Sequence, residues 1–224
     1  MYHHIALNYV TTDHGYKHIL NIRISQSYCH TWLLPRLADF HRNHPDIHLK
    51  FQTTTNTHPN IYPDINSGLD IEIINGYGDW QDLAVTKLTH NERWLVVASP
   101  SFIKQHDFSL PLEQIAYFPK IETSGYKEDW QQWFHSQRLG MPFSSAIFMF
   151  ASTQLSIDAA IQGNGMLLAK SILVQDAIQQ GDLIEVHQHQ LQSSSNHYLV
   201  TNPNSNDHYK VKMFKQWLLS IAEE

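Results

Sequence analysis

The sequence predicts an α/β protein of two Rossmann-like lobes, with two crossings of the chain between them. Strand and helix patterns alternate along most of the 224 residues, as they do in parallel sheets covered by helices. The composition is typical of a folded globular protein, with 42% hydrophobic and only 16% charged residues. The alternation is interrupted at Ser99-Pro100 and again in a segment rich in Ser and Gln, 190–196. These two interruptions are where we expect the chain to pass between the lobes.

The interruptions set the expected domain boundaries. The first lobe is predicted to contain residues 21–98 together with 197–224, and the second lobe residues 99–190. The return crossing then covers residues 191–196. Residues 1–20 are polar and show no periodicity, so we interpret them as a leader or a linker remnant.

Local hydrophobic spacing predicts the individual elements. Strand 21–25 alternates apolar and polar residues, and helix 31–43 places Leu33, Leu37 and Phe40 on one face. The other elements expected in the first lobe are strands at 47–51, 69–74, 83–88, 93–98 and 198–201, a short segment at 61–67 and a final helix from 207. The elements expected in the second lobe are strands at 115–121, 146–150, 166–169 and 183–186 and helices at 127–137, 152–162 and 172–179.

Charge, cysteine content and hydropathy limit the class of protein. The chain has 15 basic and 21 acidic residues, a formal charge of -6, so its long-range field repels a nucleic-acid backbone. The single cysteine, Cys29, has no partner for an intramolecular disulfide. The N-terminus lacks the pattern of a signal peptide, and no run approaches the roughly 18 apolar residues of a membrane span. We therefore expect a cytoplasmic protein without membrane contact.

Metal binding and catalysis receive little support from the sequence. The 16 histidines are scattered, and neither His41 with His44 nor His187 with His189 is joined by cysteines or carboxylates at a zinc-site spacing. No nucleophile elbow, Walker loop or complete G-x-G-x-x-G motif is present. We expect no enzyme activity, no metal and no cofactor. A metal-binding or enzymatic protein that uses these histidines remains an alternative hypothesis.

A family resemblance is carried by five ordered motifs between residues 20 and 220. They are Trp32–Leu37 with Phe40 and His44–Ile47, Leu69–Ile73 with Gly76–Trp80, Val97–Pro100, Ala159–Met166 with Leu168-Ala169, and Tyr198–Val200 with Phe214 and Trp217. In this order they resemble the effector-binding domain of LysR-type bacterial transcription regulators. The segment Gly76–Trp80 resembles the subgroup that includes the glycine-cleavage activator, the β-lactamase regulator and the D-serine regulator.

The resemblance implies a fold and a function. The fold would be the type II periplasmic-binding-protein-like fold, with a small effector in the cleft between the lobes and homodimers or larger homo-oligomers. The effector would be a small polar molecule such as an amino acid, a carboxylate or a peptidoglycan-type metabolite. LysR-type regulators bind DNA through an N-terminal winged helix-turn-helix, which residues 1–20 are too short to contain. DNA binding is therefore expected only through a domain absent from this chain. The alternative is a stand-alone or exported solute-binding protein of the same fold.

Polar residues at strand ends of the first lobe are candidate effector contacts. Ser25-Gln26-Ser27 lies between the first strand and its helix, where hydroxyls, an amide and helix N-terminal N–H groups would converge. Simple helix capping by serine is the alternative. Thr53 and Thr54 follow the second strand and could equally be exposed turn residues. Asn75 and Tyr77 end the third strand, where Tyr77 could line a pocket or pack beneath Trp80. Clefts of α/β proteins lie at such strand ends.

The second lobe offers an equivalent set of candidates. Glu122 and Thr123 end its first strand, where a carboxylate would favour an effector with an ammonium group or several hydroxyls, although an isolated glutamate is usually solvated. Ser152 and Thr153 precede a helix, and either could be merely its N-cap. The resemblance also implies effector contacts at this helix start.

Overall fold

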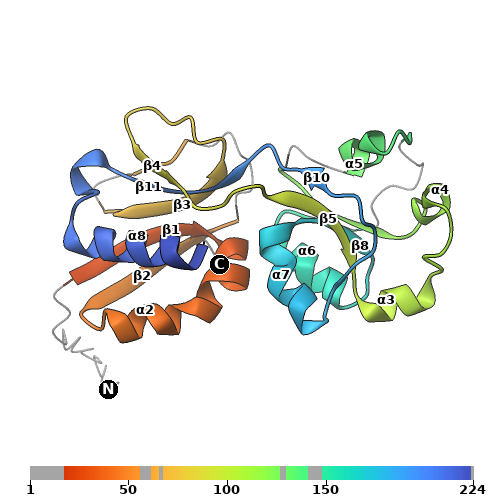
Figure 1. Ribbon diagram of the computed structural model, residues 1–224, viewed down its shortest axis with the longest axis horizontal. Coiled ribbons are helices and arrows are strands. Elements are labelled where there is room, and N and C mark those ends of the chain that lie inside the picture. Colours follow the sequence, from red (N-terminus) through yellow and green to blue (C-terminus); the bar gives the residue numbers. More distant parts are fainter. Residues whose placement is uncertain (1–17, 56–61, 66–67, 127–129, 141–147, 223–224) are drawn as a thin grey trace, which may run out of the picture.

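The computed structural model describes residues 18–55, 62–65, 68–126, 130–140 and 148–222. Two lobes lie side by side, and each contains a sheet with helices packed against it (Figure 1). The predicted two-lobed α/β architecture is confirmed.

The first lobe is built on a five-stranded mixed sheet. Its strand order is β2 (Ile47–Thr54), β1 (His18–Ser25), β3 (Ile71–Gly76), β11 (Asn196–Thr201) and β4 (Ala84–Lys87). Strands β2, β1 and β3 are parallel, and β11 is antiparallel to both of its neighbours. Because the parallel strands end at the same edge, Ser25 lies opposite Thr54. Two candidate residues far apart in the sequence therefore meet at this edge.

The helical segment after β1 begins earlier than predicted and has four parts. Helix α1 (Gln26–Tyr28) leads directly into a π-helical turn (Cys29–Leu33), a 3₁₀ turn (Leu34–Arg36) and α2 (Leu37–Asn43). Pro35 lies in the 3₁₀ turn and has no N–H to donate, which interrupts regular α-helical bonding. The predicted stop before Pro45 is confirmed, since α2 ends at Asn43.

The C-terminal helix closes the core of the first lobe. Helix α8 (Tyr209–Ala222) follows a 3₁₀ turn, Pro203–Ser205. Phe40 of α2 packs against Phe214 and Trp217 of α8, with ring centroids 5.2 and 5.1 Å apart. Both faces of the α2–α8 contact are apolar, as the helical spacing predicts.

The second lobe is built on a six-stranded mixed sheet. Its path is β10 (Leu191–Gln192), β5 (Arg93–Ala98), β8 (Met166–Lys170), β6 (Lys120–Thr123) and β7 (Phe148–Phe150), with β9 (Ile184–Glu185) also paired to β5. Its helices are α3 (Pro100–Gln105), α4 (Leu112–Ile115), α5 (Trp130–Ser136), α6 (Thr153–Ile161) and α7 (Ser171–Gln180). Strands β8, β6 and β7 are parallel, whereas β5 runs antiparallel to β8.

The position of β5 corrects the expected boundary between the lobes. The sequence pattern predicts strand 93–98 in the first lobe, but Trp94 to Val97 pair with β8 of the second sheet. The chain therefore crosses before Arg93, and Ser99 instead caps α3 through its Oγ, 3.2 Å from the N–H nitrogen of Phe102. A strand buried on both faces suits the interior of either sheet, so its apolar pattern does not choose between them. Because β10 pairs with β5, the return crossing is shortened to 193–195.

Other differences are local. Strand β1 begins at His18, so residues 18–20 belong to the first sheet and not to a leader or linker remnant, because they pair with β2. The predicted strand at 115–121 begins only at Lys120, because α4 occupies Leu112–Ile115. Segment 62–65 forms neither helix nor strand. Parts of the predicted elements at 61–67, 127–137 and 146–150 lie outside the described residues.

The lobes are joined by a continuous apolar core as well as by the two crossings. One buried cluster extends from Ile22 and Leu33 in the first lobe to Val97 and Val174 in the second. Helix α1 contacts α6 and α7, and the π-helical turn contacts α7. Figure 1 shows α6 and α7 on the side of the second lobe that faces the first. Candidate residues on α1 and α6 are thereby brought to one junction.

Candidate functional site

The candidates on the first lobe divide into buried and exposed side chains. Ser25 is the N-cap of α1, and its Oγ accepts a hydrogen bond from the backbone N–H of Tyr28 at 3.4 Å. Ser25 therefore caps a helix, which was the alternative to effector binding for this residue. Ser27 is buried, whereas Gln26 and Thr53 are exposed and Thr54 is half-buried. The structure thus groups these residues at one sheet edge, with only Ser27 shielded from solvent.

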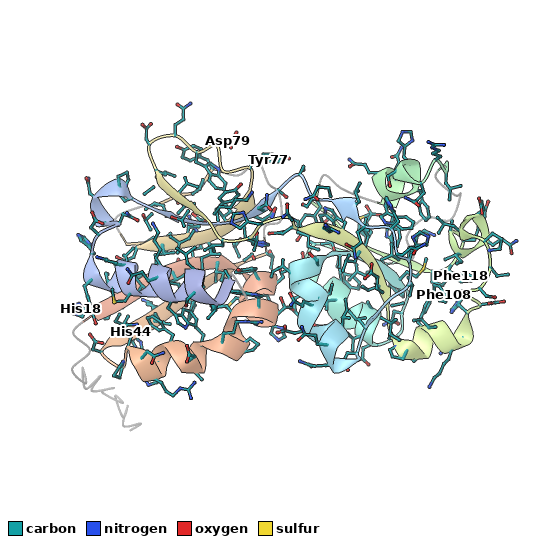
Figure 2. All side chains as sticks on the ribbon, in the orientation of Figure 1. His18, His44, Tyr77, Asp79, Phe108 and Phe118 are labelled. Carbon is teal, nitrogen blue, oxygen red and sulfur yellow. The ribbon has the colours of Figure 1, made fainter. Side chains whose placement is uncertain are left out.

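Asn75 and Tyr77 lie at the end of β3 and in the loop that follows. Asn75 is buried, and its Nδ2 donates weakly to the backbone oxygen of Asn196 at 3.5 Å. Its Oδ1 has no hydrogen-bond partner among the described residues. The backbone oxygen of Tyr77 accepts a hydrogen bond from the Tyr198 hydroxyl at 3.2 Å. Trp80 packs edge-on against the ring of Tyr198. Figure 2 shows Tyr77 and Asp79 on this loop of the first lobe.

The candidates on the second lobe are linked by hydroxyl contacts between β6 and α6. Thr123 Oγ1 donates to Ser156 Oγ at 2.7 Å, and Thr153 Oγ1 lies 3.0 Å from the Tyr126 hydroxyl. Ser152 occupies the N-cap position of α6 but makes no capping hydrogen bond through its side chain within the described part of the chain. The capping alternative is therefore realised by Ser25 and not by Ser152.

A small pocket lies beside these residues in the second lobe. Its cavity volume is about 10 Å³, and it is lined by Glu122, Thr123, Trp94, Tyr126, Trp130, Ile121 and Leu168. Trp130 is held there because its Nε1 donates to the backbone oxygen of Ile121 at 2.9 Å. Trp94 and Tyr126 pack edge to face, with ring centroids 4.8 Å apart. The aromatic lining was not predicted, since no local pattern relates residues 94, 126 and 130.

Unpartnered polar atoms lie on both elements of the α1–α6 contact. The Tyr28 hydroxyl on α1 and Gln154 Oε1 on α6 are buried and have no hydrogen-bond partner among the described residues. Gln154 Nε2 donates to Asp158 Oδ1 at 2.8 Å, so the orientation of the amide is defined. Buried polar groups are normally paired, so the lobe junction has unused capacity for hydrogen bonding.

A second polar cluster, which we call the crossing cluster, consists of Glu92, Lys170 and His197. Lys170 Nζ donates to Glu92 Oε2 at 2.8 Å and to the backbone oxygen and Oγ of Ser195 at 2.9 and 3.0 Å. The other carboxylate oxygen of Glu92 lies 2.8 Å from His197 Nδ1 and accepts from His197 N–H at 2.9 Å. Thr89 Oγ1 also donates to that oxygen. The side chains of Glu92, Lys170 and His197 are at most 3% exposed.

The cluster has clear electrostatic consequences. Burial by itself raises the pKa of the Glu92 carboxyl, but the neighbouring His197 and Lys170 outweigh burial and hold that pKa well below its ordinary range. The pKa of the Tyr28 hydroxyl is raised well above its ordinary value by burial and by the charge of Glu92. Tyr28 stacks on the imidazole of His197 at 4.2 Å between ring centroids. The crossing cluster therefore contacts the helix that carries Ser27.

The crossing cluster was not predicted from the sequence. Lys170 follows Glu92 by 78 residues and His197 follows Glu92 by 105, so no spacing rule joins them. The sequence signal is limited to position: Glu92 and His197 directly precede predicted apolar strands, and Lys170 directly follows one.

The acid dependence of folding should report on Glu92. Its pKa is lower in the folded chain than the ordinary value of 4.5, so its contribution to stability is present above that value and lost as pH falls below it. We expect the difference in unfolding free energy between wild type and Glu92→Gln to shrink from pH 7 to about pH 3. Urea unfolding at a series of pH values measures this difference. The exposed Glu113→Gln is the matched control, and an unchanged difference for Glu92→Gln would contradict the assignment.

The described residues lack two further kinds of feature. No group of three or more His, Cys, Asp or Glu side chains is arranged to hold a metal ion there. Within the same residues, no helix is both long and apolar enough to cross a membrane.

Comparison with known proteins identifies relatives by sequence. Residues 14–222 match the family model described as the LysR substrate binding domain. The glycine cleavage system transcriptional activator homolog of Haemophilus influenzae is 28% identical over 206 residues, covering 92% of this chain and 66% of the relative. The glycine cleavage system transcriptional activator of Escherichia coli is 27% identical over 208 residues with the same coverage. The chain thus spans about 66% of the length of these relatives.

Solved structures show the same fold. The effector domain of the regulator AmpR from Pseudomonas aeruginosa superposes with a TM-score of 0.75 at 22% identity, covering 92% of this chain and 96% of that one. The AmpR effector-binding domain from Citrobacter freundii also has a TM-score of 0.75, at 20% identity, covering 92% of this chain and 99% of that one. The predicted type II periplasmic-binding-protein-like fold is confirmed. Together with the match over residues 14–222, these findings show that the chain belongs to the LysR substrate-binding domain family.

Proposed function

We propose that this chain binds a small polar effector at the junction of its lobes and serves as the sensing part of a LysR-type transcription regulator. The observation that carries the proposal is a set of buried polar atoms on Tyr28, Asn75 and Gln154 that have no hydrogen-bond partner within the described residues. An unsatisfied buried polar group costs about 1–3 kcal/mol. A bound ligand that pairs with these atoms recovers that free energy, so the junction favours a polar occupant.

The chemistry of the unpartnered atoms suggests what the effector carries. Asn75 Oδ1 and Gln154 Oε1 are acceptors, so they suit the ammonium, amide or hydroxyl donors of an amino acid or a peptidoglycan-type metabolite. Ser27 and Thr153 are buried hydroxyls on α1 and α6, and hydroxyls can accept or donate. Glu122 would add a negative charge beside the second-lobe pocket. A carboxylate effector would instead use the hydroxyls and the N–H groups at the helix starts.

Binding at the junction would act on the arrangement of the lobes. A ligand that bridges α1 and α6 favours the lobe arrangement in which both sets of contacts form. In the complete protein, that preference would reach DNA through an N-terminal domain outside this chain, and through pairing of two or more copies. This role places the protein in the cytoplasm and requires no catalysis.

A thermal-shift screen tests the proposal. Amino acids, small carboxylates and peptidoglycan fragments are added separately, and a ligand present at 100 times its Kd stabilises the folded chain by about 2.7 kcal/mol. We expect at least one compound to raise the midpoint in a saturable manner. Stabilisation by none of them would count against small-molecule sensing.

A variant of Gln154 localises the site once a compound is found. Gln154→Met keeps the side-chain length but removes the unpartnered oxygen, so we expect binding to weaken by about 2- to 10-fold. Isothermal titration calorimetry measures the change. Gln52→Met, at an exposed position on β2, is the matched control and should bind as wild type does. If Gln154→Met and Gln52→Met bind the compound with equal affinity, the binding site does not include Gln154.

A further inference from the structure

The crossing cluster is located where the two lobes are joined. Glu92 belongs to the first crossing, which connects β4 to β5, and Ser195 belongs to the second, which connects β10 to β11. Lys170 ends β8 of the second lobe, and its ammonium group bonds to both crossings at once. His197 belongs to β11 of the first lobe and bonds to the same Glu92. Four chain segments from both lobes therefore meet at one carboxylate and one ammonium group.

Further bonds make the two crossings a single unit. Gln192 Nε2 and the N–H of Ser193 both donate to the backbone oxygen of Glu92, at 3.1 and 2.9 Å. At the start of the first crossing, the N–H of Leu88 donates to the backbone oxygen of His197 on β11 at 2.9 Å, which attaches this crossing to the first lobe. These bonds are directional, and a rotation of one lobe against the other would change several of them together. An apolar contact is less restrictive, because it is non-directional.

We propose that Glu92, Lys170 and His197 are positioning residues for effector sensing, which set the orientation of one lobe relative to the other and hold α1 at the junction. The link to α1 is the stacking of Tyr28 on His197 at 4.2 Å. Tyr28 also stacks on Trp32 at 5.0 Å, and the π-helical turn that contains Trp32 contacts α7. The relevance to sensing rests on the proposed function; the effect on lobe orientation does not.

A gain in stability does not explain why this position holds a buried ion pair. Removing charges from water is costly, and a buried ion pair can often be replaced by apolar residues without loss of stability. A well-packed apolar crossing would therefore fold as well. What Lys170 and Glu92 add is a set of hydrogen bonds that is complete in one arrangement of the four segments.

Distances between the lobes test the proposal. Spin labels are attached to Gln52→Cys on β2 and Asp182→Cys after α7, both exposed, in a Cys29→Ser background. Double electron–electron resonance then measures the interlobe distance in the unliganded chain. We expect one narrow distribution for the otherwise unaltered protein. Lys170→Met and Glu92→Gln should broaden the distribution by about twofold, or shift it, because more than one lobe arrangement becomes populated.

Controls separate orientation from folding. Labels at Gln52→Cys and Lys212→Cys both lie in the first lobe, so this distance should not change in either variant. Lys104→Met, at an exposed position on α3, should leave the interlobe distance unaltered. If Lys170→Met does not fold, the double variant Glu92→Gln/Lys170→Met, which carries no unpaired charge at these two positions, is measured instead. Unchanged interlobe distributions in the folded variants would overturn the proposal, even if their stability falls. A screen that finds no effector would bear only on the proposed function.

Discussion

A Lys170→Met variant is expected to unfold with a free energy about 3–5 kcal/mol lower than that of the wild-type chain. The substitution keeps an unbranched side chain but removes the ammonium group that bonds to Glu92 and Ser195. Among the described residues, His197 and Thr89 then remain as hydrogen-bond partners of the Glu92 carboxylate, which stays buried from solvent. Urea unfolding followed by circular dichroism measures the loss.

A double-mutant cycle shows whether the pair is responsible. Glu92→Gln alone should also destabilise the chain, because it leaves the Lys170 ammonium group without its carboxylate. The double variant should lose clearly less than the sum of the single losses, since neither charge is then left alone. Lys104→Met, at an exposed site, should stay within about 0.5 kcal/mol of wild type. Additive losses from the two single variants would show that Lys170 and Glu92 act independently.

A Gly78→Ala variant is expected to lose about 2–5 kcal/mol of stability through backbone strain and overpacking. Gly78 has a φ of +79°, in the left-handed region that favours glycine. An added Cβ would lie 2.6 Å from both Cε1 and Cζ of Tyr198. Tyr198 has little freedom to move, because it packs against Trp80 and its hydroxyl donates to the Tyr77 backbone.

Gly181→Ala separates the two causes. Gly181 ends α7 with nearly the same φ, +80°, but no atom lies within 4 Å of the position of an added Cβ. Its loss should therefore reflect the backbone alone, about 1 kcal/mol. Chemical denaturation of both variants gives the comparison. Similar losses would mean that Tyr198 moves aside without cost. A larger loss for Gly78→Ala would show that the loop carrying the candidate Tyr77 is held by this contact.

Local features of the fold could be predicted because their causes lie within a few residues. Alternation of apolar residues in 21–25 identifies β1, and Pro45 marks the end of α2 at Asn43. Gly163 follows the end of α6 and has a φ of +83°, as expected for a glycine after a helix. The polar residues at strand ends were also placed correctly at the carboxyl edges of β1, β2 and β6. Their roles in binding stay predictions.

Residue patterns therefore predicted the class of fold, most of its strands and helices, and the family to which its motifs belong. The tertiary structure alone decided that β5 belongs to the second sheet, that Trp94 lines a pocket with Tyr126, and that Lys170, Glu92 and His197 meet at the crossings. The two kinds of feature differ in the sequence separation of the residues that cause them. Hydrophobic periodicity reflects neighbours along the chain, whereas a strand buried on both faces suits either sheet. A buried charge likewise acquires its partner only when the topology brings distant segments together.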